Sequence, residues 1–128
     1  MYTLAATLLS FALLVQTASA GPGRVVNLVL PRDLNTNDVV WLELKLGVIE
    51  RGAEIEIETT KGQTLGVISP HGIRSGHEAG TYALPVPPEA ISDKRLSVRL
   101  TLSHGRAKRA PTNKEVKNVR LKITSPAR

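Results

Sequence analysis

The side chains of this 128-residue sequence whose types and spacing suggest a metal site are its three histidines and the glutamate beside one of them. His71 and His77 stand in a glycine-rich segment, Glu78 follows directly, and His104 lies further along the chain. Zinc and copper accept imidazole ligands, and a zinc site usually needs three or four ligands that converge on one point. A folded-back loop would bring His71 and His77 together, so a zinc or copper site at His71, His77 and His104 is one hypothesis. The spacing lacks the i, i+4 helical register of an HExxH site, and the glycines indicate a plain turn.

A catalytic site is not expected. Ser69, Ser75 and Ser103 have histidines nearby in the sequence, but a triad needs a base within hydrogen-bond reach and a third group that orients it. No GxSxG nucleophile elbow occurs, and the sequence has no cysteine to act as a nucleophile or form a disulfide. The alternating glutamates of residues 54–58 fit an exposed strand face better than paired carboxylates across a cleft. The sequence therefore predicts a protein that is not an enzyme.

Seven short runs of alternating apolar and polar residues must position these side chains. Alternation with period two places one set of side chains on a core face and the other towards solvent. Turn residues separate the runs, and none of the runs reads as a helix. The pattern predicts an all-β fold, a seven-stranded antiparallel two-sheet sandwich. The expected strands are residues 24–30, 38–46, 53–59, 63–69, 81–86, 95–102 and 116–123.

The segment EAGTY, residues 78–82, resembles the tyrosine corner of immunoglobulin-like domains. The resemblance implies an immunoglobulin-like sandwich in which Gly80 and Tyr82 turn the chain into the next strand; it implies nothing about function. Trp41 would be the buried indole that such sandwiches often carry. Strict alternation places Trp41 opposite Leu42, so a core position requires a bulge or a cover on both faces. The alternative is an exposed apolar contact patch that Trp41 forms with Val39.

The first twenty residues carry no charged side chain and contain an apolar run, Leu4–Val15. The run is shorter than the roughly 20 residues that span a bilayer, and residues 18–20, Ala-Ser-Ala, fit a small-x-small cleavage site. We therefore expect a cleaved signal peptide in residues 1–20, and a single β-sandwich domain in residues 21–128. The mature protein is expected in the periplasm or outside the cell.

The charge is divided unevenly along the chain. Residues 21–93 contain six basic and ten acidic residues, whereas residues 94–128 contain eleven basic residues and one acidic residue. If the last two expected strands pair as a hairpin, its basic side chains could bind a polyanion, such as an anionic envelope component. That set is Arg99, Arg106, Lys108, Arg109, Lys114, Arg120 and Lys122. The plainer interpretation is that acidic and basic rows neutralise each other across neighbouring strands. Nucleic acid is not an expected partner, because Trp41 and Tyr82 are the only aromatic residues of the expected mature chain, residues 21–128, that could stack on bases.

These observations predict an exported, non-catalytic β-sandwich that acts as a binding or structural accessory. Contacts with a protein partner or an anionic envelope component would run through the basic C-terminal hairpin, or through an open sheet edge by strand addition. No cofactor is expected under this interpretation. The alternative is a periplasmic zinc or copper binding protein that uses His71 and His77.

Overall fold

The computed structural model describes residues 22–126, which form eight β-strands and one short 3-10 helix. The expected signal peptide, residues 1–20, lies outside the described residues. The elements are β1 (Arg24–Val29), β2 (Val39–Val48), β3 (Glu54–Thr59), β4 (Thr64–Ile68), β5 (Glu78–Val86), η1 (Pro88–Ala90), β6 (Arg95–His104), β7 (Ala107–Arg109) and β8 (Val116–Thr124).

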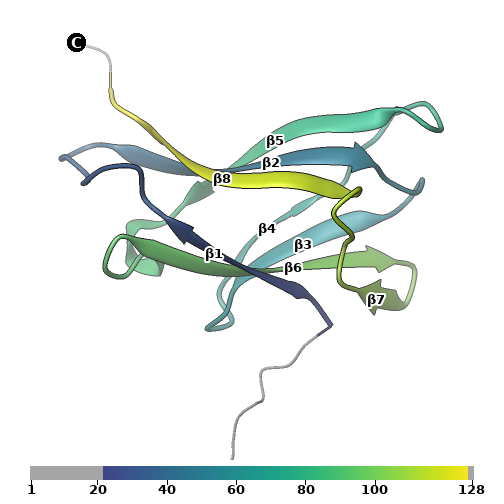
Figure 1. Cartoon of the computed structure of the whole chain (residues 1–128), viewed down its shortest axis with the longest axis horizontal. Helices are drawn as coiled ribbons and strands as arrows, with labels where there is room; N and C mark the ends of the chain where they lie inside the picture. Colours follow the sequence, from purple (N-terminus) through teal and green to yellow (C-terminus); the bar gives the residue numbers. More distant parts are fainter. Residues whose placement is uncertain (1–21, 127–128) are drawn as a thin grey trace, which may run out of the picture.

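The strands form two antiparallel sheets that face each other, so the predicted all-β sandwich is confirmed (Figure 1). One sheet has the order β1-β6-β3-β4, and β7 pairs with the last residues of β6. The other sheet has only three strands, in the order β5-β2-β8. The seven predicted strands correspond to β1–β6 and β8. The additional strand, β7, has three residues that are all exposed, so it left no alternating pattern in the sequence.

The two central strand pairs are those of an immunoglobulin constant domain, but the outermost strands pair differently. Lettered in chain order without β7, β2 beside β5 is the B–E pair, and β3 beside β6 is the C–F pair. The first strand lies beside β6 instead of β2, and the last strand lies beside β2 instead of β6. The predicted basic hairpin of the last two strands is therefore wrong. Both edges of β6 are occupied, by β3 on one side and by β1 and β7 on the other, so β8 crosses to the second sheet.

Inward-facing aliphatic side chains from both sheets fill the core. In β2, β3 and β6 the inward positions are almost completely buried, as the period-two pattern predicts. The largest of them are Leu42, Leu44, Leu46, Ile55, Ile57, Leu96, Leu100 and Leu102. The outward glutamates of β3 lie opposite Ser103, Thr101 and Arg99 of β6. Burial of this aliphatic core is the main source of stability in a chain without cysteine.

Trp41 does not belong to the core, which corrects the expectation of a buried indole. Its ring is partly buried on the outward face of β2, and its Nε1–H donates to the Thr124 hydroxyl at 2.9 Å. The bulge in the pairing of β2 with β8 falls between Lys45 and Leu46, too far along the strand to turn Trp41 inward. Trp41 instead borders a shallow hollow with Lys122 on the outer face of the three-stranded sheet.

Gly80 and Tyr82 lie where the chain enters the three-stranded sheet after crossing from β4. The Tyr82 hydroxyl donates to the carbonyl oxygen of Ala79, three residues upstream, at 3.1 Å. A tyrosine corner has this kind of local bond, but it opens the sixth strand of an immunoglobulin-like domain, whereas Tyr82 lies in the fifth strand here. Gly80 has a φ of 101°, a left-handed conformation that strongly favours glycine over residues with a Cβ.

Candidate functional site

The predicted polyanion-binding residues do not share one surface. Four of the seven have carboxylate partners on neighbouring segments: Arg99–Glu58 at 3.6 Å, Lys108–Glu56 at 3.4 Å, Arg109–Glu115 at 2.7 Å and Arg120–Glu43 at 2.6 Å. Arg106, Lys114 and Lys122 have no ion-pair partner within residues 22–126; they lie in the β6–β7 turn, the β7–β8 loop and β8. The arrangement resembles neutralising rows of opposite charge more than one basic face.

The three histidines occupy different surroundings. His104 ends β6, and its Nδ1 lies 3.4 Å from a carboxylate oxygen of Glu50. His71 lines a pocket at one end of the sandwich, whereas His77 is absent from that lining and its backbone N–H donates to the Arg74 carbonyl. Across the described part of the chain, no three His, Cys, Asp or Glu side chains gather closely enough to hold a metal ion. This geometry does not favour the metal site.

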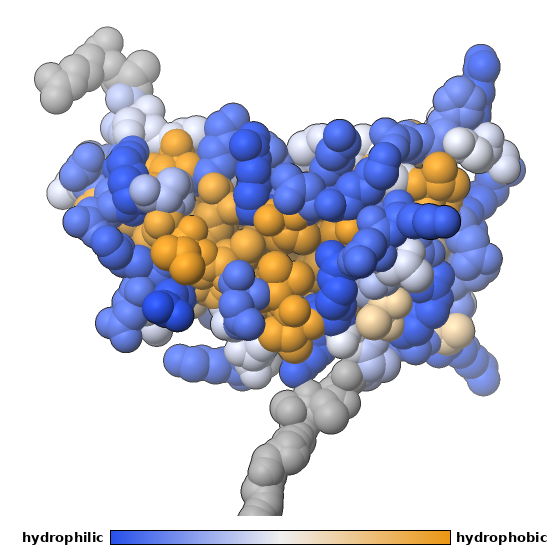
Figure 2. All heavy atoms as spheres, viewed as in Figure 1, coloured by the Kyte–Doolittle hydropathy of each residue, from blue (hydrophilic) through white to orange (hydrophobic). Residues whose placement is uncertain are grey.

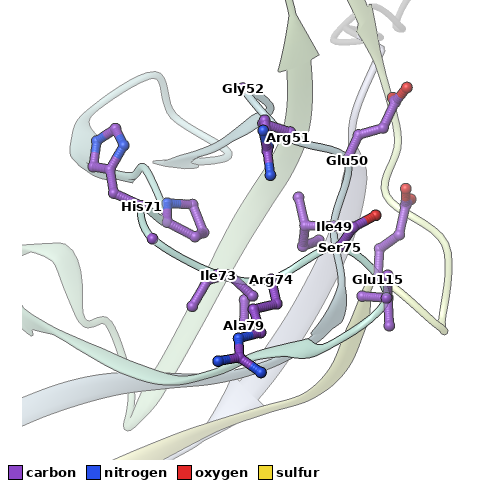
Figure 3. Close-up of a pocket in the computed structure, with 14 residues that line it drawn as sticks. Ile49, Glu50, Arg51, Gly52, His71, Ile73, Arg74, Ser75, Ala79 and Glu115 are labelled. Atoms are coloured by element: carbon purple, nitrogen blue, oxygen red, sulfur yellow. The ribbon is translucent and has the colours of Figure 1, made fainter.

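The pocket lies where the β2–β3 turn, the β4–β5 loop and the segment before β8 meet (Figure 3). Its volume is about 820 Å³. Ile49, Ile73 and Ala79 contribute its apolar lining, and each is partly buried. The ionisable side chains in its wall are Glu50, Arg51, His71, Arg74 and Glu115. The glycine-rich segment that first suggested metal binding therefore forms one wall of a hollow.

A compact hydrogen-bonded turn holds Glu115 at this pocket. The Glu115 carboxylate accepts two bonds from the Arg109 guanidinium, both at 2.7 Å, and one from the Thr112 N–H at 2.9 Å. The Glu115 N–H donates in return to the Thr112 hydroxyl, so the four residues T-N-K-E bond as a capping box does, here ahead of a strand. These bonds lower the pKa of Glu115 from 4.5 to about 2, with the Arg109 hydrogen bond as the largest cause. Glu115 therefore stays ionised at all ordinary pH values.

Gly47 fastens this turn to the end of β2. Its N–H donates to the Glu115 carbonyl at 2.8 Å. A Cβ at position 47 would lie 2.0 Å from the carbonyl oxygen of Lys114, so the close approach of the two backbones requires glycine.

The second candidate surface is the open side of the sandwich, between the edge strands β1 and β8. Figure 2 shows hydrophobic residues gathered on this side, between the two edges that face the viewer in Figure 1. Val26 and Leu28 of β1 and Val119 and Ile123 of β8 pack against the core but are only partly buried. Within residues 22–126, β1 pairs only with β6 and β8 only with β2, so each strand has one free edge.

The two free edges differ in charge. The outward row of β8 includes Arg120 and Lys122, and Lys and Arg on an edge discourage pairing with a second copy of the same edge. The central residues of β1, Val25–Val29, carry no charge, and Val25 and Val29 are 47% and 62% exposed on its outward face. The β5 edge on the opposite side of the sandwich contains Pro85, which cannot donate to a ladder.

Comparisons with known proteins identify no relative: no family model matches the sequence, and no match was found among the curated proteins or the solved structures. Among the described residues, no helix has the length and apolar character required to cross a membrane.

The sequence reasoning missed the pocket cations Arg51 and Arg74, because nothing in the pattern showed that the β2–β3 turn would meet the β4–β5 loop. The T-x-x-E spacing at Thr112 was the one signal available for the turn that holds Glu115.

Proposed function

We propose that this protein is an exported, non-catalytic binding module that adds an extended segment of a protein partner to the free edge of β8. The observation that carries the proposal is the incomplete second sheet. It has three strands against four plus β7 in the first, and the inward side chains of β1 and β8 remain partly uncovered on the open side. A strand added to β8 would form a fourth strand of the smaller sheet and bury those side chains.

The partner segment is expected to alternate apolar and acidic residues. Its inward apolar side chains would contact Val26, Leu28 and Ile123, which line the open side. Its outward side chains would lie beside Arg120 and Lys122, where opposite charges stabilise a cross-strand pair and like charges destabilise it. Lys122 has no ion-pair partner in the described part of the chain, so it can meet an acidic residue of the added strand without losing an existing contact.

A nine-residue peptide of alternating glutamate and valine, blocked at both ends, tests the proposal. Binding is expected to change the emission of Trp41, whose indole bonds to Thr124 of β8. It is also expected to slow amide exchange along β8. A peptide with the same composition in two blocks is the control, because it cannot present one apolar face.

Lys122→Glu tests the charge preference, with Lys61→Glu in the distant β3–β4 turn as the matched control. Lys122→Glu is expected to weaken binding of the glutamate peptide roughly threefold to tenfold, the size of a cross-strand charge reversal. Equal losses in both variants would indicate diffuse electrostatic attraction to an anion and would contradict strand addition. Protection of β1 in place of β8 would place the partner on the wrong edge.

A further inference from the structure

We infer that the pocket at the end of the sandwich binds a small organic carboxylate with an aliphatic chain. This site is separate from the strand edge proposed above and would hold a different class of ligand. The first reason is the balance of charge in its wall. Of the two carboxylates that line the pocket, Glu115 is paired with the Arg109 guanidinium, whereas Glu50 lies beside the His104 imidazole, which carries charge only if protonated.

The cations in the pocket wall have no such partners. Arg51 in the β2–β3 turn and Arg74 in the β4–β5 loop form no ion pair with any residue of the described chain. Both side chains are exposed, and Figure 3 shows them on the two segments that face each other across the hollow. Arg51 and Arg74 therefore have no carboxylate partner among the described residues, and a bound anion would supply one.

The remaining lining decides what kind of anion fits. Ile49, Ile73 and Ala79 supply apolar lining, and Ile49 and Ala79 also pack against the core of the sandwich. A volume of about 820 Å³ is within the range of ligand pockets, and it exceeds what an inorganic ion would fill. A guanidinium donates two parallel hydrogen bonds to a carboxylate, while a hydrocarbon chain gains free energy by covering the isoleucines. An aliphatic carboxylate satisfies both parts of the wall.

The β4–β5 loop is suited to hold such a ligand without a helix or a metal. Gly72 and Gly76 have φ values of 73° and 81°, and these left-handed turns bring His71, Ile73 and Arg74 onto one side of the hollow. Figure 3 shows the His71 imidazole at the rim, directed away from Arg51 and Arg74. The glycine-rich histidine segment thus acquires a role in binding an anion through Arg74, with His77 outside the site.

Titration of the full chain with sodium octanoate, followed by calorimetry and by amide shifts of residues 49–52 and 71–76, tests the inference. Octylamine has the same chain with a cationic head and is expected not to bind. Octyl phosphate has the same chain with another anionic head and is expected to bind as well, because a guanidinium forms bidentate pairs with carboxylate and phosphate alike.

The double variant Arg51→Gln, Arg74→Gln is expected to weaken octanoate binding at least about tenfold. Lys61→Gln, at the far end of β3, is the matched control and is expected to leave it unchanged. Both arginines are exposed, so the double variant should unfold at the temperature of the unaltered protein, which checks that the fold is intact. Equal binding of octanoate and octylamine, or no binding of octanoate, would overturn the inference. Either result would leave strand addition at β8 untouched, because Trp41 lies at the opposite end of β2 from the pocket.

Discussion

The bidentate contact between Arg109 and Glu115 gives the sharpest test of the electrostatics of this fold. Replacing Glu115 with glutamine keeps the length of the side chain and leaves an oxygen that can still accept from the Thr112 N–H. It removes the negative charge that faces the guanidinium. A fall in the pKa of Glu115 from 4.5 to about 2 corresponds to at most about 3 kcal/mol, at 1.36 kcal/mol per pH unit. The Arg109 side chain is 46% exposed, so solvent screening reduces this to about 1–2 kcal/mol.

The pH dependence has a definite sign. The folded protein holds the pKa of Glu115 below its unfolded value, so the stabilisation is fully present above about pH 4.5. It is lost as the pH falls through about 2, where the carboxylate becomes protonated in both states. The free energy of unfolding, measured in urea at several pH values, should differ between the protein and Glu115→Gln by about 1–2 kcal/mol at pH 7. The difference should shrink towards zero near pH 2. Asp38, whose pKa is also about 2, is present in both proteins and cancels from the comparison.

Arg109→Gln provides the matching half of a double-mutant cycle. If the two side chains act through each other, the double variant should be little less stable than either single variant. A difference that is independent of pH, or losses that simply add, would refute the reasoning.

Four further substitutions test the packing and the Tyr82 hydrogen bond. Gly47→Ala would place a Cβ 2.0 Å from the Lys114 carbonyl oxygen, and we expect a loss of about 2–3 kcal/mol in urea unfolding; an unchanged midpoint would show that the backbones separate freely. Leu44→Ala removes a completely buried side chain and should cost about 2–5 kcal/mol, whereas Val25→Ala on the exposed face of β1 should change stability by less than about 0.5 kcal/mol; similar losses would contradict the assignment of the core. Tyr82→Phe removes the hydrogen bond to the Ala79 carbonyl and should lower the free energy of unfolding by about 1 kcal/mol; equal thermal stability would mean that the corner contributes nothing.

The period-two pattern was enough to predict the strands and their buried faces, because burial of alternate side chains is a local property of each strand. Ile55 and Ile57 are fully buried, with glutamates outward between them, as their alternation predicted. Pairing between strands is a different matter, since the same alternation would permit β8 to lie beside β6 or beside β2. The turn chemistry does not decide between them, because the chain crosses between sheets after β7. The hairpin of basic residues was therefore wrong although each of its strands was located correctly.

The candidate site was less accessible to sequence reasoning than the fold. The residue types of the segment containing His71 indicated a loop that could bind a ligand. Its neighbours in space, however, are Arg51 and Ile49, about twenty residues away in the chain. Trp41 shows the opposite error. The alternation that places Leu42 in the core correctly predicts that Trp41 lies on the outer face. The expectation of a buried indole, which came from the resemblance to immunoglobulin-like domains, was wrong.

The exchanged positions of the first and last strands bear on how the chain folds. Leu42 pairs with Leu121, 79 positions further along the sequence, so one side of β2 has no partner until β8 has been synthesised. Closing so large a loop costs entropy that local contacts cannot recover beforehand. The five-stranded sheet can form its β3–β4 hairpin and its β6–β7 hairpin early, while the smaller sheet must wait. In a partly folded chain the leucines of β2 are then the apolar surface most prone to aggregate. Pairing of β8 with β2 is the folding step that buries them.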